Sequence, residues 1–378
     1  MISSFLKQRI DAGDFPSAVY LVAEKGEIVF HDALGHAVVE PERIEARRDT
    51  IYDLASLTKV LVTGLLAAKL IENGGLDPNE SLGSILSEFH RSNYAEATAN
   101  DLAMHVSGLP AWKPLYLIAA DPNDVMRQVG MSVSDAGQEP VTYSDLNFIV
   151  LADVVERISG SSLDDLAQQE IFDALQLGAT MFNPSVELKR IIAASESGSK
   201  HERQMCVEQG YLQPPATAVG TDEIRNPHPA FRNRLIWGEV HDGNAYFMGG
   251  FVGHAGLFST AEEVFKIAQQ LLPNYTQLLK PETCELFRTN FTKALNEDRS
   301  FAFQLASTKD STAGTKMSPE SFGHNGFTGT SLWIDPVKER IFILLTNRTH
   351  NHALPFVNIN SVRRRFHDLA VELLENKS

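Results

Sequence analysis

Alternation of apolar and polar residues near both ends of the chain predicts β-strands. Residues 18–35 have the pattern of two strands joined by a Lys-Gly turn, and strand patterns return at 301–306, 323–335 and 340–346. Because strands occupy both ends and helical patterns fill the middle, we predict one antiparallel sheet built from both ends of the chain and flanked by helices.

Apolar residues recur with helical spacing through most of the intervening chain. The most apolar helix begins at Ser56 and ends before Asn73-Gly74-Gly75, and a second well-marked helix starts at Ser144 or Asp145 and ends at Gly160. Weaker helical patterns cover residues 2–12, 81–89, 101–105, 163–175, 261–272 and 358–375. Residues 111–140 are expected to be irregular.

The order of these elements predicts an α/β (α+β) protein with a mostly helical insertion. We expect a single domain over residues 1–378, made of an α/β subdomain (1–55 and 295–378) and a mostly helical subdomain (56–294). Residues 185–240 are polar and contain proline without a clear period, so they are expected to form a lid over a site or a surface loop.

Composition narrows the class of protein. With 43% hydrophobic and 21% charged residues the chain is typical of a globular protein, and its net charge of −15 without a basic cluster argues against nucleic acid or anionic membrane as a partner. Cys206 and Cys284 have neither metal-ligand spacing nor the numbers for a disulfide framework. The sequence leaves the oligomeric state open.

Targeting signals are weak in this sequence. No run of about 20 apolar residues predicts a membrane span, and the amphipathic start does not have the pattern of a signal peptide. As written, the chain is expected to be cytoplasmic. A chain from which a leader had been removed would read the same, and would then be periplasmic or secreted.

A serine and a lysine at the start of the most apolar helix suggest nucleophilic chemistry. Ser56 and Lys59 are three residues apart, so they share one helix face, and an amine in apolar surroundings loses its proton more easily. Lys59 could therefore serve as a base toward Ser56. Ser4-x-x-Lys7 and Ser197-x-x-Lys200 have the same spacing without an apolar helix, and Ser56 alone could be an ordinary helix cap.

Tyr143 is the second candidate for this chemistry. Of the eight tyrosines, only this one precedes an Asn- or Asp-shaped residue, Asp145, by two positions. Next to Lys59 its pKa is expected to fall, so that it could accept the Ser56 proton. The alternative is a packed tyrosine with its hydroxyl satisfied at a helix end.

His324-Asn325-Gly326 opens a predicted strand, and Gly326 would let the backbone approach a ligand closely. His241 and His254 also precede a glycine by two residues, and we expect structural roles for them. A metal site from His241, Asp242 and His254 has no local ligand spacing to support it. The signatures Gly-x-Ser-x-Gly, His-Glu-x-x-His and a phosphate-binding loop are absent from the sequence.

Taken in order, Ser56-x-x-Lys59, Tyr143-x-Asp145 and His324-x-Gly326 resemble the serine β-lactamase and penicillin-binding protein superfamily, most closely its class C-like branch. Five stretches carry the resemblance: Asp-Leu-Ala-Ser-Leu-Thr-Lys (53–59), His-Val-Ser-Gly-Leu-Pro (105–110), Tyr-Ser-Asp-Leu-Asn-Phe (143–148), Gly-His-Ala-Gly-Leu-Phe-Ser-Thr (253–260) and Gly-His-Asn-Gly-Phe-Thr-Gly-Thr-Ser (323–331).

The resemblance implies a β-lactamase/transpeptidase-like fold and an acyl-enzyme on Ser56. In this scheme Lys59 and Tyr143 share the proton transfers, and the backbone N–H groups of Ser56 and Phe327 form the oxyanion hole. It implies a small ester, lactam or short peptide as substrate, and neither a metal nor a cofactor. His324, Asn325, Gly326 and Asp145 would contact the substrate.

Three departures from the family pattern bear on the substrate. A lysine usual in β-lactamases is replaced by His324, which is mostly neutral at neutral pH, and Asn325 replaces a hydroxyl residue. Asp145 stands where the family has an amide. These changes favour a less charged ester or amide and hence an esterase-type or β-lactamase activity. A D-amino-acid or cell-wall peptidase is the rival, and a non-catalytic peptide-binding module is the alternative outside enzymes.

Overall fold

The sheet of this protein joins both ends of the chain, as predicted. The computed structural model describes residues 1–213 and 231–376, so the predicted lid or loop at 185–240 lies partly outside the described residues. Seven strands follow the order β3-β2-β1-β10-β9-β8-β7, and every neighbouring pair is antiparallel. They are β1 (Ser17–Glu24), β2 (Glu27–Val38), β3 (Ile44–Glu45), β7 (Gln304–Leu305), β8 (Phe322–Asn325), β9 (Ser331–Asp335) and β10 (Arg340–Thr346).

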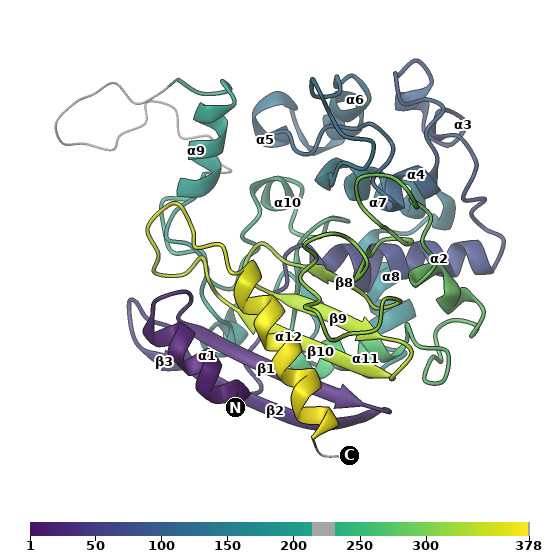
Figure 1. Cartoon of the computed structure of the whole chain (residues 1–378). Helices are drawn as coiled ribbons and strands as arrows, with labels where there is room; N and C mark the ends of the chain where they lie inside the picture. The colour runs from purple at the N-terminus through teal and green to yellow at the C-terminus, as the bar shows by residue number, and fades with distance from the viewer. Residues whose placement is uncertain (214–230, 377–378) are drawn as a thin grey trace.

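Helices bury both faces of this sheet (Figure 1). Alternate side chains of a strand point to opposite faces, so Tyr20 and Val22 of β1 pack with α1 (Ile2–Asp11) and α12 (Asn360–Glu375). Their neighbours in β1 face the larger core, which also contains α11 (Ala261–Gln269). Burial on both faces explains why β1 and β10 are almost continuously apolar.

One predicted strand, 323–335, is wrong, because it is two strands joined by a turn. Strand β8 ends at Asn325, and β9 begins at Ser331. The backbone N–H of Gly326 donates to the carbonyl oxygen of Thr330 at 2.9 Å, and Gly329 has φ of +113°. The glycines that the sequence places inside the strand therefore reverse the chain.

The most apolar helix has an irregular first part. Residues Lys59–Thr63 form a π-helical turn, and α2 (Gly64–Glu72) continues from it. A π-helical turn is frequent at functional sites. The second well-marked helix, α7 (Asp145–Ser159), begins after the cap residue Ser144 and ends at Gly160, as predicted.

Short helices make up most of the remaining insertion. They are α3 (Leu82–Ile85), α4 (Ala99–Ala103), α5 (Leu115–Ile118), α6 (Val125–Gly130), α8 (Leu163–Ala167), α9 (Lys200–Glu208) and α10 (Gly243–Phe247). Helices α5 and α6 lie in a stretch predicted to be irregular. A small sheet orders its strands β4 (Tyr52–Asp53), β6 (Leu257–Ser259) and β5 (Met181–Phe182). No helix among the described residues is long and apolar enough to span a bilayer.

The subdomain boundaries stay a prediction. Helix α11 falls within the predicted helical subdomain, yet its buried residues share the core below the sheet with β1 and β10. Strands and helices of the two predicted subdomains therefore bury apolar surface together.

Close packing at Gly253 places the glycine-rich segment, residues 249–256, against the central helix and α7. The carbonyl oxygen of Gly253 accepts a hydrogen bond from Thr63 Oγ1 at 2.8 Å. An added Cβ would lie 2.1 Å from the carbonyl oxygen of Phe148 and 2.5 Å from the Cβ of Ala152, both on α7. Only a glycine fits at this contact.

We therefore expect Gly253→Ala to destabilise the fold. The new methyl group would meet the backbone of α7, and such overpacking costs about 1–3 kcal/mol. Urea denaturation of the full chain measures this change. Gly178→Ala is the matched control, because no atom lies within 4 Å of its added Cβ. Equal unfolding midpoints for the two variants would contradict the prediction.

Candidate active site

Ser56 lies in a tight turn between strand β4 and the central helix. The preceding residue, Ala55, has φ of +47°, which a non-glycine residue rarely adopts. The carboxylate of Asp53 holds this turn by accepting the Ala55 N–H at 2.8 Å. Ser56 is partly exposed, whereas both its neighbours are buried. The turn therefore presents the hydroxyl at the surface of the apolar helix.

Lys59 is the centre of the polar contacts around Ser56. Its side chain is fully buried, and its Nζ donates to Ser56 Oγ at 3.1 Å and to Asp145 Oδ1 at 2.6 Å. A third hydrogen bond reaches the carbonyl oxygen of His254 at 3.2 Å. The structure thus brings together Ser56, Lys59 and Asp145, although Lys59 and Asp145 are 86 residues apart along the chain.

The ion pair with Asp145 reverses the pKa shift that the sequence predicted for Lys59. Burial by itself lowers the pKa of this ammonium, but the charge and hydrogen bond of Asp145, together with Tyr143, raise the pKa above its ordinary value. The prediction of a lowered lysine pKa is therefore wrong. It considered the apolar helix and not the carboxylate that α7 supplies.

Tyr143 lies beside Lys59, with the Nζ atom 5.0 Å from the centre of its ring. Burial raises the pKa of the phenol more than Lys59 and the hydrogen bonds of Lys59 and Ser56 lower it. The predicted fall in the tyrosine pKa is therefore wrong as well. Packing against His105, at 4.8 Å between ring centres, holds the partly exposed phenol in this position.

The turn between β8 and β9 is tied to the backbone that precedes Ser56. Thr328 Oγ1 donates to the carbonyl oxygen of Asp53 at 2.8 Å, and Thr330 Oγ1 donates to that of Leu54 at 3.0 Å. An added Cβ on Gly326 would lie 2.5 Å from the Leu54 oxygen. The approach predicted for Gly326 is therefore an approach to the protein's own chain.

These hydrogen bonds bring two backbone N–H groups close together, that of Ser56 and that of Phe327 in the turn between β8 and β9. Among the described residues, the N–H groups of Ser56 and Phe327 have no hydrogen-bond acceptor. Unpaired donors next to a nucleophile are the requirement for an oxyanion hole. Their role as such a pair is a proposal, which the free donors support.

His324 and Asn325 point to opposite faces of β8, as neighbours in a strand must. His324 Nδ1 donates to the Asn325 carbonyl oxygen at 2.8 Å, and its ring packs 5.6 Å from that of Tyr143. Burial, and then the charges of Lys59 and Arg299, hold the pKa of His324 well below its usual range. The imidazole at this position is therefore neutral.

The Asn325 side chain is occupied elsewhere. Its amide exchanges two hydrogen bonds with Thr312 Oγ1, at 3.0 and 2.9 Å. The same hydroxyl accepts a hydrogen bond from Trp333, which belongs to the core between the sheet and α12. We therefore leave Asn325 out of the proposed substrate contacts.

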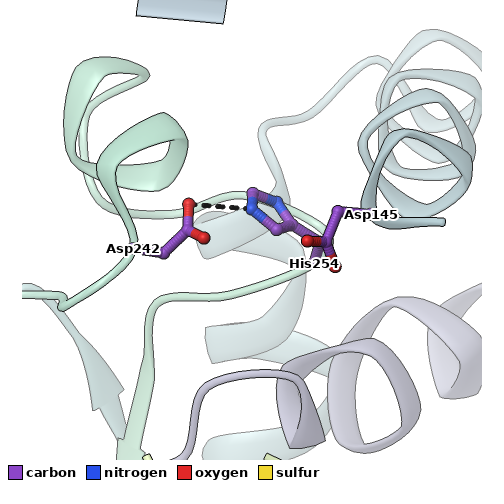
Figure 2. Close-up of side chains that lie close together, drawn as sticks. All are labelled: Asp145, Asp242 and His254. Atoms are coloured by element: carbon purple, nitrogen blue, oxygen red, sulfur yellow. Dashed lines mark hydrogen bonds and ion pairs between the residues drawn. The ribbon is translucent and has the colours of Figure 1, made fainter. Parts of the chain in front are cut away.

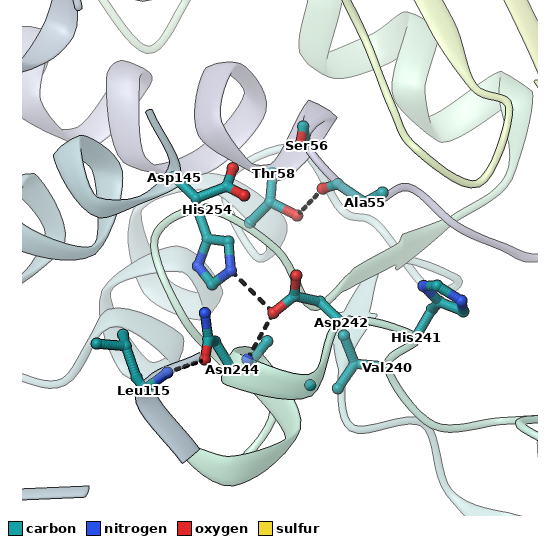
Figure 3. Close-up of polar contacts among 12 residues, drawn as sticks. Ala55, Ser56, Thr58, Leu115, Asp145, Val240, His241, Asp242, Asn244 and His254 are labelled. Atoms are coloured by element: carbon teal, nitrogen blue, oxygen red, sulfur yellow. Dashed lines mark hydrogen bonds and ion pairs between the residues drawn. The ribbon is translucent and has the colours of Figure 1, made fainter. Parts of the chain in front are cut away.

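Asp242 and His254 form a pair at the site that we did not predict from the sequence. Asp242 Oδ1 accepts a hydrogen bond from His254 Nε2 at 2.9 Å and also accepts the Ala245 N–H (Figure 3). Burial would raise the pKa of Asp242, but His254 and Lys59 hold it well below its usual range. The sequence grouped Asp242 and His254 only in a possible metal site with His241, and the two His-x-Gly segments carry no signal for this pairing.

His241 does not take part in this pair. Its Nε2 lies 3.0 Å from Glu196 Oε2, and Figure 3 shows its ring on the far side of Asp242 from His254. The metal site considered for His241, Asp242 and His254 is therefore wrong in its composition, because His241 has a different carboxylate as its partner.

A different trio could hold a metal ion. Potential ligand atoms of Asp145, Asp242 and His254 lie within 4.8 Å of one another (Figure 2). The Lys59 ammonium already forms an ion pair with Asp145. A divalent cation would have to compete with this ammonium, so the expectation of a site without metal or cofactor is retained as a prediction.

A partly exposed serine bonded to a buried lysine next to a tyrosine, beside strand β8 of an antiparallel sheet, defines a serine hydrolase of the β-lactamase and penicillin-binding protein superfamily. The chain belongs to the family described as Beta-lactamase, whose family model matches residues 2–363. A protein of Escherichia coli (strain K12), named "Putative D-alanyl-D-alanine carboxypeptidase", is 28% identical over 376 residues, covering 92% of this chain and 81% of the relative.

Solved structures share the fold. A class C β-lactamase from Rhodobacter sphaeroides aligns with a TM-score of 0.67 and 18% identity, covering 99% of each chain. EstCE1, a hydrolase with promiscuous acyltransferase activity, aligns with a TM-score of 0.71 and 18% identity, covering 98% of this chain and 97% of that one. These likenesses confirm the predicted fold class.

The pH dependence of Ser56 reactivity tests the Lys59–Asp145 pair. Because the pKa of Lys59 is raised above 10.5, its neutral form accumulates only in strongly alkaline solution, and labelling of Ser56 by a fluorophosphonate should accelerate as pH rises. In Asp145→Asn the carboxylate charge is lost and burial dominates. The rising limb of the rate should then move down by roughly 1–3 pH units.

Asp153→Asn is the matched control for this experiment. Asp153 is also on α7 but pairs with Arg157, so its loss should leave the pH profile in place. Coincident profiles for the wild type and Asp145→Asn would show that Asp145 does not set the pKa of the base.

Proposed function

We propose that this serine hydrolase forms an acyl-enzyme on Ser56 and hydrolyses an ester or amide with esterase-type or β-lactamase activity. The observation that carries the proposal is the meeting of Ser56, Lys59 and Tyr143 beside two unpaired backbone N–H groups. This arrangement supplies a nucleophile, groups that move protons and donors for an oxyanion.

The resting site holds its protons, because both the lysine and the tyrosine have raised pKa values. In the reactive fraction, neutral Lys59 takes the Ser56 proton as Oγ attacks the carbonyl carbon, and the negative charge develops on the carbonyl oxygen. The proton then passes to the leaving group, through Tyr143 where that group lies beyond the reach of Lys59. A water molecule repeats the sequence to release the acid.

The absence of a charge at His324 favours uncharged substrates. His324 is neutral, and Lys59 is committed to Asp145, so neither offers a free positive charge to a substrate carboxylate. A cavity of about 310 Å³ lies beside Phe327, and its walls combine the rings of Phe327, His201 and Phe356 with the charged side chains of Arg348 and Glu208. The three rings favour an ester or amide with an apolar or aromatic group.

Removal of the nucleophile tests the activity. Ser56→Ala should abolish fluorophosphonate labelling and lower the hydrolysis of a short-chain p-nitrophenyl ester by roughly 10³-fold or more, since a missing nucleophile leaves only binding and electrostatic effects. Mass spectrometry of the labelled wild type locates the modified residue. Ser107→Ala serves as the control and should be labelled normally, because the Ser107 hydroxyl donates to Asn147 rather than to Lys59 or Tyr143.

Labelling at a residue other than Ser56, or turnover that survives Ser56→Ala, would contradict the proposal. Ligand binding by the wild type without any acylation would instead favour the non-catalytic binding module.

A second candidate function is a peptidase acting on D-amino-acid peptides. Arg299 supports it, because its buried guanidinium lies 5.6 Å from the Tyr143 ring. Its Nη2 pairs with Glu297 at 2.9 Å, but its Nε and Nη1 have no hydrogen-bond partner among the described residues. A substrate carboxylate could provide such a partner. The name of the relative from Escherichia coli points to the same class of substrate.

A positive charge introduced at position 324 should distinguish the esterase-type or β-lactamase activity from the peptidase activity. We expect His324→Lys to raise the ratio of turnover of D-alanyl-D-alanine peptides to turnover of p-nitrophenyl esters by about 10-fold, because a hydrogen bond to a charged group contributes roughly 1.5–3 kcal/mol. Steady-state kinetics on both substrates measure the ratio. His90→Lys adds the same charge at an exposed position and should leave it unchanged.

A wild type that already prefers D-alanyl peptides would favour the peptidase. An unchanged ratio in His324→Lys would show that position 324 does not contact this part of the substrate.

A further inference from the structure

A buried arginine lies directly behind the turn that carries the Phe327 N–H. Arg363, in the first turn of α12, is 5% exposed. Its Nη2 donates to the carbonyl oxygens of Gly326 at 2.7 Å and of Thr330 at 2.9 Å. Its Nη1 donates to Asn360 Oδ1 at 2.9 Å. All these acceptors are uncharged, and no described carboxylate forms an ion pair with Arg363.

Burying a guanidinium without a carboxylate is energetically unfavourable. Burial, and then the neighbouring Arg348, lower the pKa of Arg363 to about 9. Arg348 also forms no ion pair among the described residues, since it donates to the carbonyl oxygens of Phe327 at 2.7 Å and Val357 at 2.8 Å. Two guanidinium groups therefore direct positive charge at one turn, and no described carboxylate pairs with either of them.

The peptide that joins Gly326 and Phe327 connects this charge to the site. Its carbonyl oxygen accepts from Arg363, and its N–H belongs to the same planar, conjugated unit. A charge-assisted hydrogen bond to the carbonyl polarises the peptide, and chains of hydrogen bonds strengthen one another in this way. The N–H of Phe327 should therefore be a stronger donor than that of an ordinary peptide.

The other peptide of the same region has a weaker arrangement. The carbonyl oxygen of Ala55, in the peptide that carries the Ser56 N–H, accepts from the Thr58 hydroxyl at 2.7 Å and from the Thr58 N–H at 3.0 Å. Both donors are neutral. Only the Phe327 side is supported by a full positive charge.

We propose that Arg363 is a positioning residue that polarises the Gly326–Phe327 peptide, so that its N–H stabilises the oxyanion formed during attack by Ser56. This proposal rests on the proposed function. The negative charge that develops in the transition state supplies the anion that the buried guanidinium lacks in the resting protein. Arg363 acts through the peptide and does not contact the substrate.

A carbonyl stretching frequency reports this polarisation directly. The full chain is acylated with an ester carrying a ¹³C-labelled carbonyl, and the acyl-enzyme is measured by isotope-edited infrared difference spectroscopy. In Arg363→Gln we expect the stretch to move to higher frequency and the acylation rate constant to fall about 10-fold with KM changed less than about twofold. This loss is smaller than the roughly 10²–10³-fold effect of deleting an oxyanion-hole donor, because the N–H remains.

Arg364→Gln is the matched control. Arg364 is the next residue of α12 and also donates to a backbone carbonyl, that of Asp310, but at the surface. It should leave both the frequency and the rate unchanged. A folded Arg363→Gln that keeps the wild-type frequency and acylation rate would overturn the proposal. Absence of Ser56 labelling in the wild type would instead overturn the proposed function.

Two further measurements test the proposal even if Arg363→Gln does not fold. Arg363→Lys keeps the charge but cannot hold both carbonyls with one fork, so it should restore part of the frequency shift and of the rate. In the wild type, a boronic acid bound to Ser56 should move the Phe327 amide proton downfield more than the Ser56 amide proton in NMR spectra. An equal or smaller shift at Phe327 would overturn the proposal.

Discussion

The structure of the site depends on one buried ion pair, between Lys59 and Asp145. The Lys59 side chain is fully buried, so its ammonium requires a negative partner, and Asp145 at 2.6 Å provides it. The same ammonium bonds Ser56 and the carbonyl of His254. One cation therefore links the central helix, α7 and the glycine-rich segment, and loss of either charge would leave the other buried and unpaired.

A second constraint connects this ion pair to the sheet. The hydroxyls of Thr328 and Thr330 bond the carbonyls of Asp53 and Leu54, immediately before the nucleophile. These bonds join two segments that lie about 275 residues apart in the sequence. The Phe327 N–H is thereby held in register with Ser56 by hydroxyl-to-carbonyl hydrogen bonds, and a rigidly held backbone loses little entropy when an oxyanion forms.

Local patterns in the sequence predicted most of this architecture and the contact between Ser56 and Lys59. Ser56 and Lys59 were predictable because their contact depends only on helical spacing, and the sheet because both chain ends carry strand patterns. The strand 323–335 was not, because the turn depends on the φ of Gly329 and on the hydrogen bond from Gly326 to Thr330, which the strand pattern does not reveal. Asn325 was assigned to the site, although strand alternation places it opposite His324.

Features set by distant segments were beyond local patterns. Burial lowers the pKa of Lys59, whereas the charge and hydrogen bond of Asp145 raise it. Asp145 reaches Lys59 only because α7 packs beside the central helix. His254 could be paired with Asp242 only once both were placed in space. The charges also differ between the two sides of Ser56. Asp145 pairs with the Lys59 ammonium and Asp242 lies close to Asp145, whereas the carbonyl behind the Phe327 N–H faces Arg363, which pairs with no described carboxylate. Under the proposed mechanism the oxyanion therefore forms on the side where positive charge is unbalanced, and this asymmetry of charge follows from the packing of distant segments.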